Sequence, residues 1–181
     1  MSRPRLESGA TAFLDRDGTI NEPAAEGEYI VSPAEVRLLP GAGEAVRRLN
    51  ELPATVVVVT NQRGIALGKM SEADLEAVNG RLGELLAQQG ARLDVILHCP
   101  HENDTCDCRK PGPAMFERAV REVPGARLEG AAMVGDSAID VEAGRRLGLT
   151  TVRLGETAAG EPPADHASAG LLDAVGWLTE P

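Results

Sequence analysis

The stretch Ala54-Thr55-Val56-Val57-Val58-Val59-Thr60 decides the fold class of this chain. Its four consecutive valines are β-branched and apolar on both faces, which is typical of a parallel strand buried from both sides. Shorter segments of similar character predict four more strands: Thr11–Asp15, Leu93–His98, Ala131–Gly135 and Thr150–Leu154. Because open parallel sheets bind ligands at the carboxyl ends of their strands, the residues after these segments are candidates for function.

Segments with helical spacing of apolar residues separate the predicted strands. The clearest is Ser71–Gln89, where Ser71 and Asp74 resemble a capping box. The other predicted helices are Gly43–Leu52, Pro113–Val123, Asp140–Leu147 and Leu171–Leu178. This alternation predicts an α/β fold with a doubly wound parallel sheet, and Gly155–Gly170 is a predicted surface loop.

The composition predicts a single globular domain over residues 1–181. A chain of 181 residues, 43% of them hydrophobic, can bury roughly two thirds of its unfolded surface without disulfides. With 18 basic and 28 acidic residues the net charge is −10, which argues against nucleic acids and anionic membranes as partners. No apolar run reaches the ~18–20 residues of a membrane span, and no signal peptide is visible, so we expect a cytoplasmic monomer.

Polar residues follow or end four of the predicted strands. Asp15 ends the first and Asp17 follows it, Thr60 ends the second, and Asp136 follows the fourth. Lys110, one of only two lysines beside 16 arginines, follows the third and can neutralise an anion as a compact cation. A turn or a helix cap explains any one of these groups alone, but their convergence on one sheet edge favours a functional site.

Two neighbouring carboxylates suit covalent catalysis, in which one attacks and the other moves protons. Two such charges about 4 Å apart repel by about 4 kcal/mol at an effective dielectric near 20, which disfavours an anionic substrate. A divalent cation held by Asp15, Asp136 and the Asp17 carbonyl would reverse this effect, and oxygen ligands favour Mg²⁺. Thr60 and Asn61 could then donate hydrogen bonds to a phosphate. These residues predict metal-assisted phosphoryl chemistry.

A second candidate metal site lies within ten residues of sequence. It comprises Cys99, His101, Cys106 and Cys108. An odd number of clustered cysteines in a reducing compartment favours metal over disulfides. Three thiolates and one imidazole form a complete tetrahedral set for a structural Zn²⁺, whereas the alternative is three free thiols in a loop.

The segment Phe13-Leu14-Asp15-Arg16-Asp17-Gly18-Thr19 resembles the first motif of the haloacid dehalogenase superfamily of phosphatases. The second to fourth motifs resemble, in order, Thr60-Asn61-Gln62, Lys110, and Gly135-Asp136 with Asp140. The resemblance extends from about Thr11 to Leu154 and implies the Rossmann-like core of that superfamily. Only about twenty residues separate Asn21 from Pro40, so we expect no cap domain and an open site closed by loops.

The cysteine loop, residues 99–108, resembles one branch of the superfamily. That branch holds D-glycero-D-manno-heptose 1,7-bisphosphate phosphatases and histidinol-phosphate phosphatases. The segments Gly27-Glu28-Tyr29-Ile30 and Gly64-Ile65-Ala66-Leu67-Gly68-Lys69 are more similar to the heptose enzymes. Arg63, Leu67 and Ser137 depart from the heptose pattern, which leaves the anomer and the exact sugar open.

The resemblance implies a role for each matched residue. Asp15 forms an aspartyl-phosphate, while Asp17 protonates the leaving sugar oxygen and then activates water. Thr60 and Lys110 hold the phosphoryl group, and Asp136 completes the Mg²⁺ site.

The remaining matched residues are implied to bind substrate or to support the site. Asn61, Gln62, Arg63 and Arg109 are the expected substrate contacts, and the two arginines face the part remote from the hydrolysed phosphate. Asp140 is expected to support the site without binding the metal.

Three functions are consistent with the sequence. The first is a Mg²⁺-dependent phosphatase of a small sugar bisphosphate, converting the heptose 1,7-bisphosphate to its 1-phosphate. The second is a phosphatase of histidinol phosphate or another small metabolite. The third is a catalytically inactive, zinc-stabilised binding module, which would require one of Asp15, Asp17, Lys110 or Asp136 to be missing, and none is.

Overall fold

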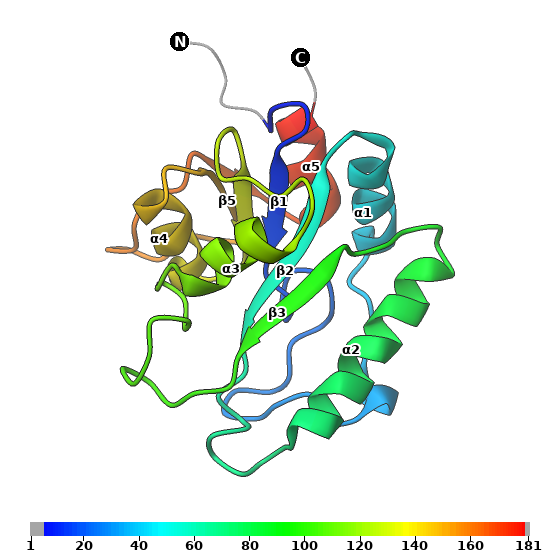
Figure 1. Cartoon of the computed structure of the whole chain (residues 1–181), viewed down its shortest axis with the longest axis vertical. Coiled ribbons are helices and arrows are strands. Elements are labelled where there is room, and N and C mark those ends of the chain that lie inside the picture. The colour runs from blue at the N-terminus through cyan, green and yellow to red at the C-terminus, as the bar shows by residue number, and fades with distance from the viewer. Residues whose placement is uncertain (1–5, 180–181) are drawn as a thin grey trace.

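The computed structural model describes residues 6–179 and contains a six-stranded parallel sheet (Figure 1). Its strands are β1 (Thr11–Leu14), β2 (Thr55–Asn61), β3 (Val95–Cys99), β4 (Ala132–Gly135), β5 (Thr150–Leu154) and β6 (His166–Ser168). They lie in the order β3-β2-β1-β4-β5-β6, and neighbouring strands pair in parallel. The valines of β2 are fully buried between β1 and β3, as their β-branched run predicts.

Helices cover both faces of the sheet. They are α1 (Ala42–Glu51), α2 (Glu72–Ala87), α3 (Ala114–Glu122), α4 (Ala138–Arg146) and α5 (Leu171–Thr179), with a short 3₁₀ helix, η1 (Pro33–Glu35). Apolar residues of α1, α2 and α5 form one core cluster with the sheet, and those of α3 and α4 form the other. The predicted doubly wound α/β fold is therefore confirmed.

Capping boxes begin two of the α-helices. Ser71 accepts a hydrogen bond from the main chain of Asp74, whose carboxylate accepts one from the Ser71 main chain, as the sequence predicts for α2. Ser137 and Asp140 form the same arrangement at α4. Because Ser137 caps the helix, α4 begins at Ala138, two residues before the predicted start.

The prediction of a loop over residues 155–170 is wrong for its last part, because His166–Ser168 forms β6 beside β5. The Asp165 carboxylate accepts hydrogen bonds from the Thr151 main chain and hydroxyl, which ties the edge strand to β5. The His166 ring stacks on Trp177 of α5, with centroids 4.3 Å apart. A strand of three residues is too short to show an alternating pattern in sequence.

Among residues 6–179, the segment between Asn21 and Pro40 contributes η1 and no separate lid domain. This agrees with the expectation of a site without a cap. Within the same residues, no helix has both the length and the apolar character needed to cross a membrane. The single-domain boundary 1–181 stays a prediction, since residues 1–5 and 180–181 lie outside the described part.

Candidate active site

The carboxyl edge of the sheet gathers three aspartates. Asp15 follows β1, Asp136 follows β4, and Asp140 lies in the first turn of α4. One carboxylate oxygen from each lies within 4.8 Å of the others. The sheet order explains this, because β1 and β4 are neighbours and their ends coincide. The predicted convergence of Asp15 and Asp136 is thus present in the structure.

A tight turn after β1 determines how closely these acids approach. The Arg16 carbonyl accepts hydrogen bonds from the main-chain nitrogens of Thr19, Ile20 and Asn21. Gly18 has a φ of +80°, and a Cβ at this position would lie 2.0 Å from Asp136 Oδ2. Only glycine fits both the left-handed backbone and this close approach.

Lys110 connects two of the acids through its ammonium group. Its Nζ donates to Asp15 Oδ1 at 2.7 Å and to Asp140 Oδ1 at 2.6 Å. The side chain is only 3% exposed, so water does not screen these ion pairs. The other Asp140 oxygen accepts from the hydroxyl of Ser137. Asp140 therefore holds Lys110 and caps α4, and its supporting role stays a prediction.

Asn61 fixes the main chain around Lys110. Its Nδ2 donates to the Lys110 carbonyl at 3.1 Å, and its Oδ1 accepts from the Lys110 nitrogen at 2.9 Å. The substrate-binding role of Asn61 stays a prediction, and its amide is paired with the protein's own backbone. These two hydrogen bonds tie the end of β2 to the loop that carries Lys110.

Burial and charge together set the protonation of the site. Burial, opposed by Lys110, raises the pKa of Asp15 from 3.8 to about 7. Burial and the neighbouring Asp140 raise the pKa of Asp136. Burial alone would lower the pKa of Lys110, but Asp140 and Asp15 outweigh it and raise that pKa. The ammonium therefore stays charged, and a further cation would favour the ionised form of both acids.

Asp17 lies in a different environment from Asp15. Its side chain is 28% exposed, and its two oxygens accept hydrogen bonds from Arg16, Asn21 and Gln62. Gln62, a predicted substrate contact, is 1% exposed and donates to both Asp17 and Thr60. The sequence pattern predicts no role for Arg16 or Asn21.

The two predicted distal arginines lie in different surroundings. Arg63 forms an ion pair with Glu102 of the cysteine loop. Arg109 lines a cavity of about 500 Å³ together with Lys110, Gly112, Ile139 and Arg146. Within the described residues its buried Nη1 has no hydrogen-bond partner. A second cavity of about 520 Å³ opens beside Gly18 and Asp136.

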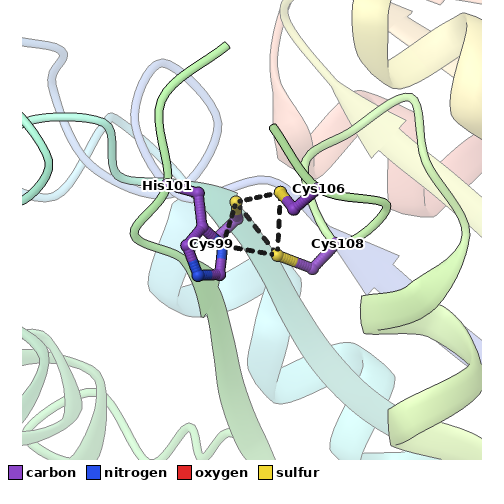
Figure 2. Close-up of side chains that lie close together, drawn as sticks. All are labelled: Cys99, His101, Cys106 and Cys108. Carbon is purple, nitrogen blue, oxygen red and sulfur yellow. Dashed lines mark hydrogen bonds between the residues drawn. The ribbon is translucent and has the colours of Figure 1, made fainter. Parts of the chain in front are cut away.

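The four predicted ligands of the cysteine loop converge at the end of β3 (Figure 2). The Sγ atom of Cys108 lies 3.2 Å from the Sγ atoms of both Cys99 and Cys106, and 3.1 Å from His101 Nδ1. Burial of Cys108, together with its sulfur neighbours, raises the pKa of its thiol. A cation at the centre would oppose this rise and favour the ionised thiolates, because thiolates are the form that binds metal. The residues fit a tetrahedral metal site with three sulfur ligands and one nitrogen ligand.

Comparisons with known proteins agree with this geometry. Residues 107–174 match a family described as HAD-hydrolase-like. The chain is 45% identical, over 77% of its length and 78% of the relative, to the D-glycero-beta-D-manno-heptose-1,7-bisphosphate 7-phosphatase of Pseudomonas aeruginosa. The chain belongs to the heptose-bisphosphate phosphatases of the HAD superfamily. The protein is therefore a hydrolase of phosphate esters. Neither a histidinol-phosphate phosphatase nor an inactive binding module is favoured.

Other relatives of this heptose-bisphosphate phosphatase family differ in the anomer that their names give. A Mycobacterium bovis relative, 37% identical over 72% of the chain and 68% of its own length, is named for the alpha anomer. The solved D,D-heptose 1,7-bisphosphate phosphatase of B. bronchiseptica, complexed with magnesium and phosphate, superposes with a TM-score of 0.82. It is 34% identical, and the match covers 93% of the chain and 97% of that structure.

We predict that Lys110→Met destabilises the protein in a pH-dependent manner. Removing one partner of a buried ion pair costs about 3–5 kcal/mol, here because Asp15 and Asp140 lose their counter-charge. Without the ammonium the folded-state pKa of Asp15 rises further above 3.8, so stability falls as the pH rises from about 4. Urea unfolding without added Mg²⁺ should show a greater loss at pH 8 than at pH 5.5.

The matched control is Lys69→Met, which removes the only other lysine. The Lys69 side chain is 43% exposed, so its replacement should change the free energy of unfolding by less than about 0.5 kcal/mol. An equal loss for Lys110→Met at both pH values would contradict the charge balance described for the site.

Proposed function

We propose that this chain is a Mg²⁺-dependent phosphatase that hydrolyses the 7-phosphate of D-glycero-D-manno-heptose 1,7-bisphosphate and leaves the 1-phosphate. The observation that carries the proposal is the buried Asp15, paired with Lys110 and adjacent to Asp136, in a chain of this family. The net charge of −10 supports a small phosphorylated sugar rather than a nucleic acid or membrane as the partner. The enzyme acts as a cytoplasmic monomer in this proposal.

The proposed reaction has two steps on one side chain. Asp15 attacks phosphorus, the bond to the sugar oxygen breaks, and Asp17 gives that oxygen a proton. Asp17 then removes a proton from water, the water oxygen attacks phosphorus, and the bond to Asp15 breaks to release phosphate. The 28% exposure of Asp17, against nearly complete burial of Lys110, suits a group that exchanges protons with water.

Thr60 and Lys110 hold the transferred group. Gln62 donates to Thr60 Oγ1, so the threonine hydroxyl can direct its own hydrogen toward a phosphoryl oxygen. Lys110 supplies a fixed positive charge beside the nucleophile. Because both side chains are nearly completely buried, they stabilise charge on the phosphoryl group in a poorly screened environment.

The donor set fits Mg²⁺. The carboxylates of Asp15 and Asp136 and the main-chain carbonyl of Asp17 would hold the ion, whereas Asp140 is held by Lys110 and Ser137. Bound Mg²⁺ supplies positive charge that offsets repulsion between the acids and the phosphate.

The cysteine loop fits a structural Zn²⁺. The four donors leave no position for water, so the ion would have no direct part in the reaction. Cys108 directly precedes Arg109 and Lys110, and the metal would therefore fix the main chain that carries both cations. The cysteine loop therefore leads directly into the active site along the chain.

The second phosphate is assigned to Arg63 and Arg109. Arg109 lines the cavity beside Lys110, and its buried Nη1 is without a hydrogen-bond partner within the described residues. Arg63 is paired with Glu102, which competes with a phosphate for the same guanidinium group.

We predict that Asp15→Asn retains the fold but reduces phosphate release to below a few per cent of wild type, because an amide does not attack phosphorus. The assay is phosphate release from α- and β-heptose 1,7-bisphosphate, fructose bisphosphate and histidinol phosphate. The wild type should prefer a heptose bisphosphate. Preference for histidinol phosphate would contradict the proposed substrate, and substantial turnover by Asp15→Asn would contradict the nucleophile.

A second prediction tests the distal phosphate. Arg63→Ala should raise KM at least about tenfold for the bisphosphate, since a bidentate phosphate contact is lost, and less than threefold for the matching monophosphate. Glu102→Gln should lower KM for the bisphosphate, because it frees Arg63. Arg121→Ala, on an arginine 68% exposed in α3, is the control. Equal changes for both substrates would show that Arg63 does not bind the second phosphate.

A third prediction concerns the cysteine loop. Elemental analysis should find one Zn²⁺ per chain, and Cys106→Ser should lower the unfolding midpoint and raise KM, because the loop that carries Arg109 and Lys110 loses its anchor. The Mg²⁺ concentration that gives half-maximal activity should stay within about twofold, since Asp15 and Asp136 are unchanged. A fully active enzyme without zinc would refute this role.

A further inference from the structure

Arg16 lies between the two catalytic aspartates in the sequence, and its side chain is buried. It is 0% exposed and is the largest fully buried side chain in the described part of the protein. A charged side chain is rarely buried in this way unless it is paired and hydrogen-bonded. Among residues 6–179, Arg16 forms no hydrogen bond or ion pair with the Asp15 carboxylate or Lys110, so the proposed reaction gives it no direct part.

The guanidinium group of Arg16 holds Asp17 on one side and α2 on the other. Its Nε and Nη2 donate to Asp17 Oδ1 at 3.1 and 3.0 Å, and Nη2 also donates to Oδ2 at 2.9 Å. Its Nη1 donates to Asn79 Oδ1 at 2.9 Å. All three guanidinium nitrogens therefore have hydrogen-bond partners, and Asp17 and Asn79 together fix the plane of the group.

The Asp17 carboxylate has its direction set by this contact. Five hydrogen bonds reach its two oxygens: three from Arg16, one from Asn21 and one from Gln62. Asn21 and Gln62 each reach a different oxygen and are neutral. Arg16 alone contacts both oxygens and carries a charge, so it contributes most to the orientation of the carboxylate plane.

We propose that Arg16 is a positioning residue for proton transfer by Asp17, and that Asn79 of α2 holds Arg16 in the required orientation. The inference rests on the proposed function and deepens it. Arg16 fixes where the Asp17 carboxyl group lies relative to the leaving oxygen, while Lys110 and Thr60 hold the phosphoryl group independently of it.

This division of roles has a kinetic consequence. A sugar alkoxide is a poor leaving group and needs a proton from Asp17, whereas a nitrophenolate leaves without one. The ratio kcat/KM reports the steps up to release of the first product, so it isolates this proton transfer from later hydrolysis. Loss of Arg16 should therefore reduce kcat/KM selectively for the sugar ester.

The experiment compares the heptose bisphosphate with p-nitrophenyl phosphate, using Arg16→Met, Arg16→Lys and Asn79→Leu. We expect Arg16→Met to reduce kcat/KM about 100-fold for the sugar ester and less than threefold for the aryl ester. Arg16→Lys should recover part of the loss, and Asn79→Leu should lose about three- to tenfold, again on the sugar ester only. Arg81→Met, on a partly exposed arginine of α2, is the control and should match wild type.

Separate values of kcat and KM for the sugar ester also test the positioning role of Arg16. For Arg16→Met, kcat should fall while KM stays within threefold, because Thr60 and Lys110 still bind the phosphoryl group. Should Arg16→Met unfold below the assay temperature, Asn79→Leu decides together with Arg16→Lys, since Asn79 is only partly buried.

Three outcomes separate this inference from the proposed function. Equal losses on both esters, or a higher KM at unchanged kcat, overturn the positioning role and show that Arg16 is only structural. Wild-type rates for Asn79→Leu overturn the part assigned to α2, and if Arg16→Met does not fold, wild-type rates for both Asn79→Leu and Arg16→Lys overturn the positioning role. A wild type that hydrolyses neither ester overturns the proposed function itself.

Discussion

The ammonium group of Lys110, held between Asp15 and Asp140, is the interaction on which the site depends. Two buried carboxylates near a third, Asp136, would repel one another without a cation. Much of the surrounding structure serves this contact. Asn61 fixes the Lys110 main chain, and the Ser137 cap orients Asp140. The remaining negative charge is what a divalent cation at the sheet edge would offset.

Asp15 and Asp17 are separated by one residue but lie in different environments. This difference suits them to different roles in the reaction. Burial raises the pKa of Asp15 to about 7 in the metal-free protein, so its ionised form depends on nearby cations. Asp17 is partly exposed and is held by Arg16, Asn21 and Gln62. Divergent environments for paired acids are a recurrent basis for assigning one as nucleophile and the other as proton donor. The turn that permits both requires glycine at position 18.

Sequence patterns predicted the parallel sheet and the convergence of Asp15, Asp136 and Lys110, because a buried valine run and polar strand ends are local signals. They did not predict that Arg16 is buried or that Asn61 and Gln62 face the protein itself. Those contacts join residues 45 to 63 positions apart, such as Gln62 with Asp17 and Arg16 with Asn79, and no local pattern encodes them. The strand β6 was missed since three residues show no periodicity.

Calorimetric titration of Mg²⁺ in two buffers of different ionisation enthalpy tests the central claim most directly, because it counts protons released on binding. If Asp15 retains a proton up to about pH 7 until a cation joins Lys110, binding should release at least about one proton at pH 6, to which Asp136 can add, and close to none at pH 8.5. Release of no protons at pH 6, with Mg²⁺ still bound, would contradict the account, since Asp15 would then be ionised without the cation.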